Sequence, residues 1–130
     1  MMNLKLLASH EHQPPAEGDA RVVALANDAD ATALPLEGVE RVDLHFPNFT
    51  DGRAFSQAFL LRRRRGFAGE IRATGDVLID QLVQMQRTGF DVAVLKDGVD
   101  ASAAQRQLDR YAGFYQGSAV ETQPQFAKAV

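Results

Sequence analysis

Glycine recurs at a fixed spacing through the middle of this sequence. Gly52, Gly75 and Gly98 lie 23 residues apart, and the same 23 residues separate Gly66-Phe67 from Gly89-Phe90. A fixed period of this size indicates one supersecondary unit that is used more than once. The period is too short for two helices and suits one strand followed by one helix. The chain is therefore expected to repeat a βα unit.

Apolar segments between polar turns mark the strands of these units. Near-continuous apolar runs suit strands buried on both faces, whereas alternation suits a strand with one exposed face. The segment 41–46 alternates apolar and polar residues and is stopped by Pro47. A short strand at 4–8 is also expected, within a polar lead-in that covers residues 1–20. The strands predicted for the main domain are 21–26, 41–46, 70–74 and 92–96.

Apolar residues at helical spacing follow three of these strands. In the second helix, Leu78, Leu82 and Met85 form one face, which is typical of an amphipathic helix. Gly66 and Gly89 suit the left-handed backbone position that ends a helix. The predicted helices are 51–64, 76–88 and 101–116, with a short helix near 30–34.

This alternation predicts the α/β class, with repeated βα units around a small, mainly parallel four-stranded sheet. Two arrangements stay open: an open twisted sheet with helices on both faces, or half of a (β/α) barrel covered by a second copy. An incomplete parallel sheet leaves edges that a homodimer would hide, so a homodimer is one expectation. The single domain is expected to span residues 21–116, with residues 117–130 as a loose tail or an added edge strand.

Composition and motif content exclude several classes of function. A net charge of −3 argues against nucleic-acid binding. The absence of cysteine removes disulfides, thiolate nucleophiles and cysteine-bound metal or iron–sulfur sites. No dinucleotide, P-loop, serine-hydrolase or zinc-protease motif is present, so no cofactor is expected. No apolar run approaches the roughly 18 residues of a membrane span, and we expect a cytoplasmic protein without membrane contact.

Polar residues follow the predicted strands at their carboxyl ends. In parallel α/β folds ligands bind at this rim, beside helix N-termini that favour anions. The sequence therefore predicts a site for an anionic small molecule there, with Asp51 or Asp76 as the candidate catalytic base. The ligand-binding candidates are Asn48, Thr50, Asp51, Arg53, Arg72, Thr74, Asp76, Asp80, Gln81 and Lys96.

Helix capping is the simpler explanation for each aspartate of the rim, because aspartate is a preferred N-cap residue. Arg53 differs, since a cation in the first turn of a helix opposes the helix dipole. Its position requires a neighbouring anion, which is either Asp51 or a ligand.

Four consecutive arginines, Arg62, Arg63, Arg64 and Arg65, end the first long helix. Cations are favoured at a helix C-terminus, so a solvated helix end explains them without a function. The alternative is a surface that docks onto an acidic partner protein.

The histidines give little support to a metal site. His10 and His12 flank Glu11 in a polar segment that offers no third ligand, so no metal is expected. His45 lies on the alternating strand 41–46 and is interpreted as a packing or capping residue.

Two motifs carry a family resemblance that covers about residues 21–115. They are F-P-x-F-T-D-G-R at 46–53 and G-E-I-R-A-x-G-D-V-x-x-D-Q-L at 69–82. Through them the chain closely resembles a bacterial family catalogued as domain of unknown function nine-hundred-and-thirty-four. The polar residues of these motifs are Asn48, Thr50, Asp51, Arg53, Glu70, Arg72, Asp76, Asp80 and Gln81.

The resemblance implies a role in assimilatory sulfate or sulfite reduction. Genes of this family typically stand beside those for assimilatory sulfite or nitrite reductase and phosphoadenylyl-sulfate reductase, and members are often labelled oxidoreductases. Two hypotheses follow. In the first, the protein is an accessory that docks on a sulfite or phosphoadenylyl-sulfate reductase. In the second, it is a small enzyme or binding protein for an anionic molecule at the rim. The residues favour the first slightly, because no recognised catalytic constellation is complete.

Overall fold

All five strands of the sheet run parallel. The computed structural model describes residues 4–48 and 50–119. The strands pair in the order β1-β5-β4-β3-β2. This confirms the α/β class and the parallel sheet, but the predicted count of four strands is wrong by one. The strands are β1 Lys5–Leu7, β2 Val22–Leu25, β3 Arg41–Phe46, β4 Glu70–Gly75 and β5 Val92–Val94.

The fifth strand is β1, which the prediction placed in the lead-in. It lies at one edge of the sheet, where Lys5 pairs with Val92 of β5. The backbone N–H of Lys5 donates to the carbonyl of Asp91 at 2.8 Å, and that of Leu95 donates to Leu7 at 2.8 Å. A strand of three residues is stable here because β5 supplies a ready row of backbone partners.

The helices confirm most of the predicted segments and correct two boundaries. Residues 76–78 are not helical, because the N–H of Asp76 donates to the carbonyl of Phe46 and Leu78 has an extended backbone. At the C-terminus α3 runs three residues past the predicted end at Gln116, and the remainder of the predicted tail lies outside the described residues. The helical elements are the 3₁₀ turns η1 Ser9–Glu11, η2 Ala31–Ala33 and η4 Ile79–Gln81, the π-helical turn η3 Leu60–Arg64, and α1 Arg53–Phe59, α2 Leu82–Thr88 and α3 Ala101–Ala119.

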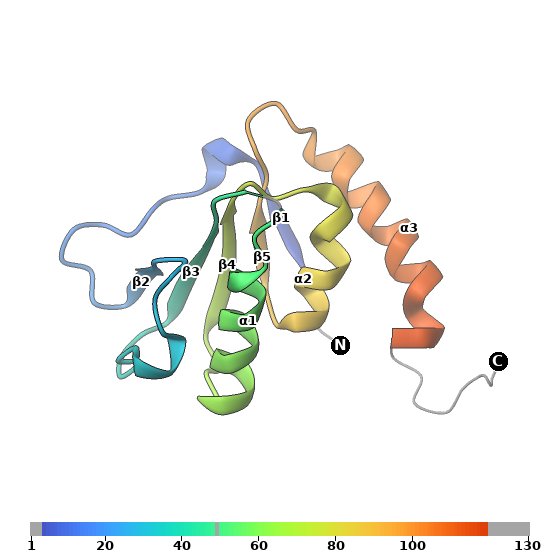
Figure 1. The fold of residues 1–130 in the computed structure, drawn as a ribbon. Helices are drawn as coiled ribbons and strands as arrows, with labels where there is room; N and C mark the ends of the chain where they lie inside the picture. The colour runs from blue at the N-terminus through green and yellow to red at the C-terminus, as the bar shows by residue number, and fades with distance from the viewer. Residues whose placement is uncertain (1–3, 49, 120–130) are drawn as a thin grey trace.

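The α-helices α1, α2 and α3 all lie on one face of the sheet (Figure 1). The strands β2, β3, β4 and β5 are neighbours in chain order, and right-handed crossovers place their connections on the same side. From β2 to β5 each new strand is added toward the edge that holds β1, whereas the connection from β1 to β2 runs toward the opposite edge. A right-handed crossover in that direction lies on the other face of the sheet, and residues 8–21 pass behind the sheet in Figure 1. Strands β1 and β2 lie at opposite edges of the sheet, so the sheet is open. Among the described residues the second face carries no α-helix, only the segment 8–21 with the 3₁₀ turn η1, so the expected arrangement with helices on both faces is wrong there. We call this second face the helix-free face.

Alternation along the strands separates the two faces of the sheet. In β3, Val42, Leu44 and Phe46 are fully buried beneath the helices, as expected for one side of a pleated strand. The ring of Phe46 packs edge-on against Phe55 of α1, with centroids 5.0 Å apart, and lies 5.9 Å from Phe90. The core is thus a single layer between the sheet and three helices.

Two glycines of the 23-residue repeat occupy backbone conformations that other residues avoid. Gly89 ends α2 with a φ of 116°, as the sequence predicted, and a Cβ there would lie 2.6 Å from Cγ of Arg62. Gly75 ends β4 with a φ of 92°, and a Cβ there would collide with the carbonyl oxygen of Phe46. Glycine is required at both positions by conformation and by space.

Candidate functional site

The predicted rim at the carboxyl ends of the strands is occupied by local ion pairs. Nη2 of Arg53 lies 2.7 Å from Oδ2 of Asp51, and the backbone N–H of Arg53 donates to Oδ1 at 3.0 Å. The hydrogen bond from the Arg53 side chain lowers the pKa of Asp51 below its ordinary value. The anion that Arg53 needs at the start of α1 is therefore Asp51, the first of the two alternatives.

The other polar groups of the rim are also engaged nearby. Nζ of Lys96 lies 2.8 Å from Oδ1 of Asp76. Oδ1 of Asn48 accepts hydrogen bonds from the backbone N–H and the hydroxyl of Thr50. An anion entering this rim would compete with carboxylates already bound to both cations.

Four of the predicted ligand-binding residues lie away from this arrangement. Arg72 and Thr74 point to the helix-free face of the sheet, because they alternate with buried Ile71 and Ala73 along β4. Asp80 and Gln81 lie in η4, on the layer of helices. The structure thus divides the ten candidates among several surfaces.

Two of the four consecutive arginines, Arg62 and Arg65, are hydrogen-bonded to the rest of the protein, and the other two are exposed. Arg62 donates to the carbonyls of Gly89, Phe67 and Gly69 at 3.0, 2.7 and 2.7 Å and pairs with Asp91 at 2.6 Å. Arg65 donates to the carbonyls of Ala31 and Thr32, each at 3.0 Å. These two side chains tie the end of η3 to neighbouring loops. Arg63 and Arg64 are exposed.

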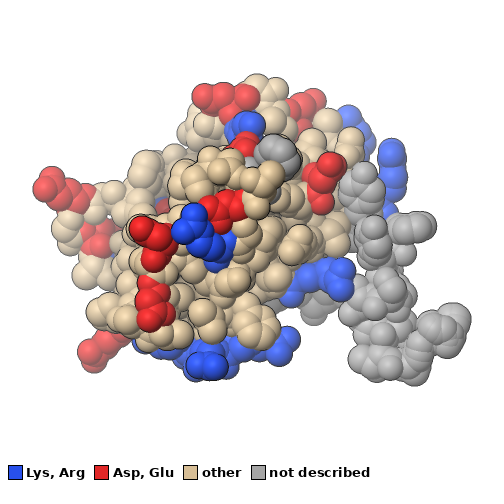
Figure 2. Space-filling view, viewed as in Figure 1, with Lys and Arg blue, Asp and Glu red and all other residues tan. Residues whose placement is uncertain are grey.

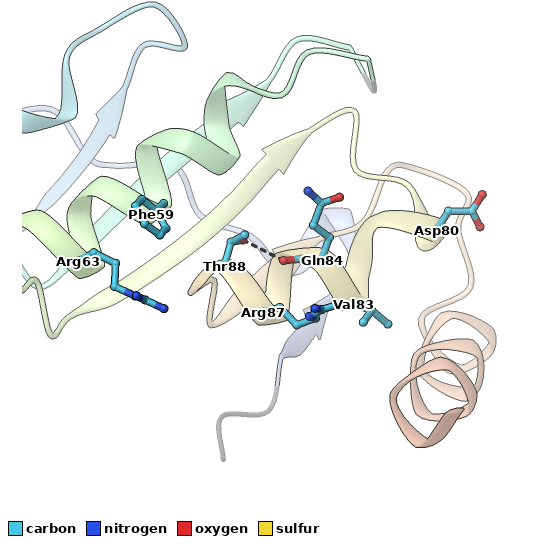
Figure 3. A pocket seen from close by; sticks show the side chains of 7 residues that line it. All are labelled: Phe59, Arg63, Asp80, Val83, Gln84, Arg87 and Thr88. Atoms are coloured by element: carbon cyan, nitrogen blue, oxygen red, sulfur yellow. Dashed lines mark hydrogen bonds between the residues drawn. The ribbon is translucent and has the colours of Figure 1, made fainter. Parts of the chain in front are cut away.

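A groove of about 580 Å³ lies beside Arg63, between the α1–η3 segment and the η4–α2 segment. Figure 3 shows Phe59 and Arg63 on one wall and Arg87 and Thr88 on the other. The guanidinium of Arg63 stands 5.3 Å from the centre of the Phe59 ring, and Phe59 is the most exposed large hydrophobic residue described, at 48%. We call this surface the α1–α2 groove. Its remaining lining residues are Asp80, Val83 and Gln84.

The helix-free face carries a network of charges that sequence reasoning missed. Arg41 and Asp43 of β3 form a bidentate pair, with distances of 2.8 and 2.9 Å. On β4, Nε of Arg72 lies 2.7 Å from Oε2 of Glu70. Asp43 is only 4% exposed, and its hydrogen bonds raise the pKa of Arg41. The signal that could have revealed this network is the in-phase alternation of polar residues in 41–46 and 70–75.

His12 joins this network from the segment behind the sheet. Its Nδ1 lies 3.0 Å from Nη1 of Arg72, and its Nε2 lies 3.9 Å from Oδ2 of Asp43. Burial lowers the pKa of His12, and the cations Arg72 and Arg41 add to the effect against the opposing pull of Asp43. Burial and the two cations therefore favour the neutral imidazole.

A hollow of about 470 Å³ opens beside His12 on the helix-free face. His45, interpreted as packing or capping, is instead exposed at this hollow, with Nδ1 at 3.4 Å from the hydroxyl of Thr74. We call it the sheet-face hollow. Its lining residues are His12, Pro14, Pro15, Ala24, Leu25, Ala26, Asn27, Asp43, His45 and Thr74.

Two kinds of feature are absent from the described residues. In the part of the chain that the structure describes, no three histidine, aspartate or glutamate side chains gather closely enough to hold a metal ion. Glu11 accepts a hydrogen bond from the N–H of Ala8 at 2.8 Å, which is a capping role. None of the helices within residues 4–48 and 50–119 has the length and apolarity needed to cross a membrane.

These features define a small parallel α/β protein with two separate candidate surfaces, a basic groove on its helices and a polar hollow on its bare sheet face. The chain belongs to the family described as "Bacterial protein of unknown function (DUF934)", whose model matches residues 22–126. The resemblance seen in the two sequence motifs is thereby confirmed. No curated protein and no solved structure matches the chain.

Proposed function

We propose that this protein is an accessory protein that binds an acidic surface of a partner through the α1–α2 groove. The observation that carries the proposal is the contrast between two sets of cations. Lys96 and Arg53 at the rim each hold a carboxylate, whereas within the described residues Arg63, Arg64 and Arg87 hold none within 4 Å.

The groove also combines the side chains that dominate protein interfaces. Arginine and aromatic residues are enriched among the residues that carry most of the binding energy, and acidic partners meet them by charge complementarity. Phe59 supplies an exposed aromatic ring, and Arg63 stacks on it. In Figure 2 basic side chains gather along the lower edge of the molecule, where η3 ends, while most acidic ones lie above and to the left.

The proposed partner is a sulfite or phosphoadenylyl-sulfate reductase. This part of the proposal rests on the family resemblance and its gene neighbours, not on the groove itself. A docking role also suits a chain without cysteine, because the redox chemistry would then belong to the partner. The homodimer expected from the open sheet edges remains a prediction, and light scattering of the purified chain tests it.

The alternative, binding of an anionic small molecule at the rim, is less well supported. Arg53 would have to exchange Asp51 for the ligand, and Lys96 would have to leave Asp76. In both cases a ligand from solution would have to replace a carboxylate of the same chain, whose effective concentration is high, and this disfavours ligand binding.

The experiment is co-purification of the tagged chain from cells grown on sulfate as the sole sulfur source. We expect a reductase to be recovered with the wild-type chain and lost with the double variant Arg63→Glu/Arg87→Glu. Because exposed charges are screened by salt, recovery should also fall as ionic strength rises. The matched control is Arg106→Glu, an exposed arginine on α3, which should leave recovery unchanged.

Two results would overturn the proposal. One is a wild-type preparation that brings down no reductase. The other is undiminished recovery with the double variant, provided that its circular dichroism and thermal midpoint match the wild type.

A further inference from the structure

The sheet-face hollow lies on the opposite face of the sheet from the α1–α2 groove and has no part in the proposed docking. Its floor is formed by β2, β3 and β4, and residues 12–15 form a wall. Binding sites for small molecules are commonly hollows with mainly apolar walls and a few convergent polar groups. Here Pro14, Pro15 and Ala24 supply apolar walls, and His12, Asp43 and His45 supply polar groups.

Asp43 is the buried polar group of this hollow. It is 4% exposed, and each of its oxygens accepts one hydrogen bond from Arg41, at 2.8 and 2.9 Å. A carboxylate has about four acceptor positions on its two oxygens. Asp43 therefore keeps acceptor capacity beyond its pair with Arg41.

The contact with Arg72 determines which ring nitrogen of His12 carries the proton. An arginine side chain can only donate, so Nδ1 of His12, at 3.0 Å from Nη1 of Arg72, must accept. The ring proton of the neutral imidazole is then on Nε2. Nε2 lies 3.9 Å from Oδ2 of Asp43, which is too far for a direct hydrogen bond. A donor and an acceptor thus face a gap that one small polar group can bridge.

The charges around the gap favour a neutral ligand. Arg41 is paired with Asp43 and Arg72 with Glu70, so the network is balanced without a further ion. Because these four charges cancel, neither an anion nor a cation gains a net attraction there. The bridging group must accept from Nε2–H of His12 and donate to Asp43, and an amide with N–H and C=O side by side does both.

We propose that the sheet-face hollow binds a small neutral molecule with a cyclic amide edge, such as a lactam or pyrimidine ring, held between His12 and Asp43. The ring would lie against Pro14, Pro15 and Ala24, and His45 would border its outer side.

The test uses the full chain, labelled with ¹⁵N and titrated with uracil up to about 10 mM, a range suited to a weak ligand with a Kd near 1 mM. We expect shifts of the His12 and His45 ring signals. With 1,3-dimethyluracil, which has no N–H, we expect affinity at least about tenfold lower, the equivalent of about 1.4 kcal/mol for the lost hydrogen bond.

Variants locate the site. Ala24→Leu narrows the hollow from an exposed position of β2 and should abolish the shifts, whereas Ala68→Leu, at an exposed position outside the hollow, should preserve them. The proposal is overturned by the absence of shifts at the highest uracil concentration, by equal affinity for the dimethylated ring, or by unchanged binding to a folded Ala24→Leu variant. The two-ligand comparison on the wild-type chain decides the matter even if that variant does not fold.

Discussion

Nη2 of Arg62 lies 2.6 Å from Oδ2 of Asp91, and this pair joins η3 to the residue that precedes β5. The same carboxylate oxygen accepts the backbone N–H of Ile71 at 2.9 Å. Arg62 also donates to three backbone carbonyls. One side chain therefore connects η3 to the segments that lead into β4 and β5.

Replacing Arg62 should destabilise the fold without touching the α1–α2 groove. We expect Arg62→Ala to lower the free energy of unfolding by about 2–3 kcal/mol, because three carbonyls and a partly buried carboxylate lose their donor. Chemical denaturation measures the change. Arg64→Ala, at an exposed position of the same run, should change stability by less than about 0.5 kcal/mol. Equal effects of the two variants would contradict the assignment of Arg62 as a structural residue.

Gly89 should not tolerate a side chain. Gly89→Ala forces a Cβ onto a backbone with a φ of 116° and against Cγ of Arg62 at 2.6 Å, and we expect a loss of about 2 kcal/mol. The control is Gly52→Ala, where φ is −91° and nothing lies within 4 Å of the added carbon. Thermal unfolding should leave that variant at or above the wild-type midpoint, and a drop as large as that of Gly89→Ala would refute the conformational argument.

His12 should make stability depend on pH. Its pKa is lowered in the folded chain, chiefly by burial, relative to an ordinary value of 6.5. The unfolded chain then binds the proton first, so stability is complete above pH 6.5 and falls as pH drops from there toward the folded-state pKa. His12→Asn keeps an acceptor for Arg72 but does not titrate. Urea unfolding at several pH values between about 5.5 and 7.5 should show a slope for the wild type that is absent from the variant.

Arg53 should control the titration of Asp51. In Arg53→Ala the side-chain hydrogen bond that is the main cause of the lowered pKa is lost, so the pKa of Asp51 should rise toward its ordinary value. The rise should be incomplete, since the backbone N–H of residue 53 still donates to Oδ1. Carboxyl ¹³C NMR titration measures this. An unchanged pKa would show that the pair does not persist in solution.

Regular features of the sequence predicted the parallel sheet well. The 23-residue glycine repeat indicated βα units, and the alternation in 41–46 predicted a strand whose apolar residues Val42, Leu44 and Phe46 are buried in the structure. These signals are local, because each depends on residues within one strand or one turn. The start of α2 was predicted too early, since a tertiary contact, the N–H of Asp76 to the carbonyl of Phe46, keeps that segment extended.

The candidate site was harder to predict, because its partners are distant in sequence. His12 meets Asp43 and Arg72 only because residues 8–21 cross behind the sheet. The spacing of residues in the sequence does not indicate this crossing, and a short polar segment with two prolines predicts only a loop or lead-in. By contrast, the pair Asp51–Arg53 was foreseen as one of two alternatives, since both residues lie in one turn.

The position of β1 also sets an order of assembly. Strands β2 to β5 pair with neighbours that follow one another along the chain, whereas Lys5 pairs with Val92, which is far from it in the sequence. Closing so long a loop costs more chain entropy than closing the short ones, and long-range pairings tend to form late. A chain emerging from the ribosome can therefore build β2, β3 and β4 before β1 has a partner. We therefore expect the segment that walls the sheet-face hollow to settle across the sheet after β5 has formed, so that the hollow is among the last parts of the structure to be completed.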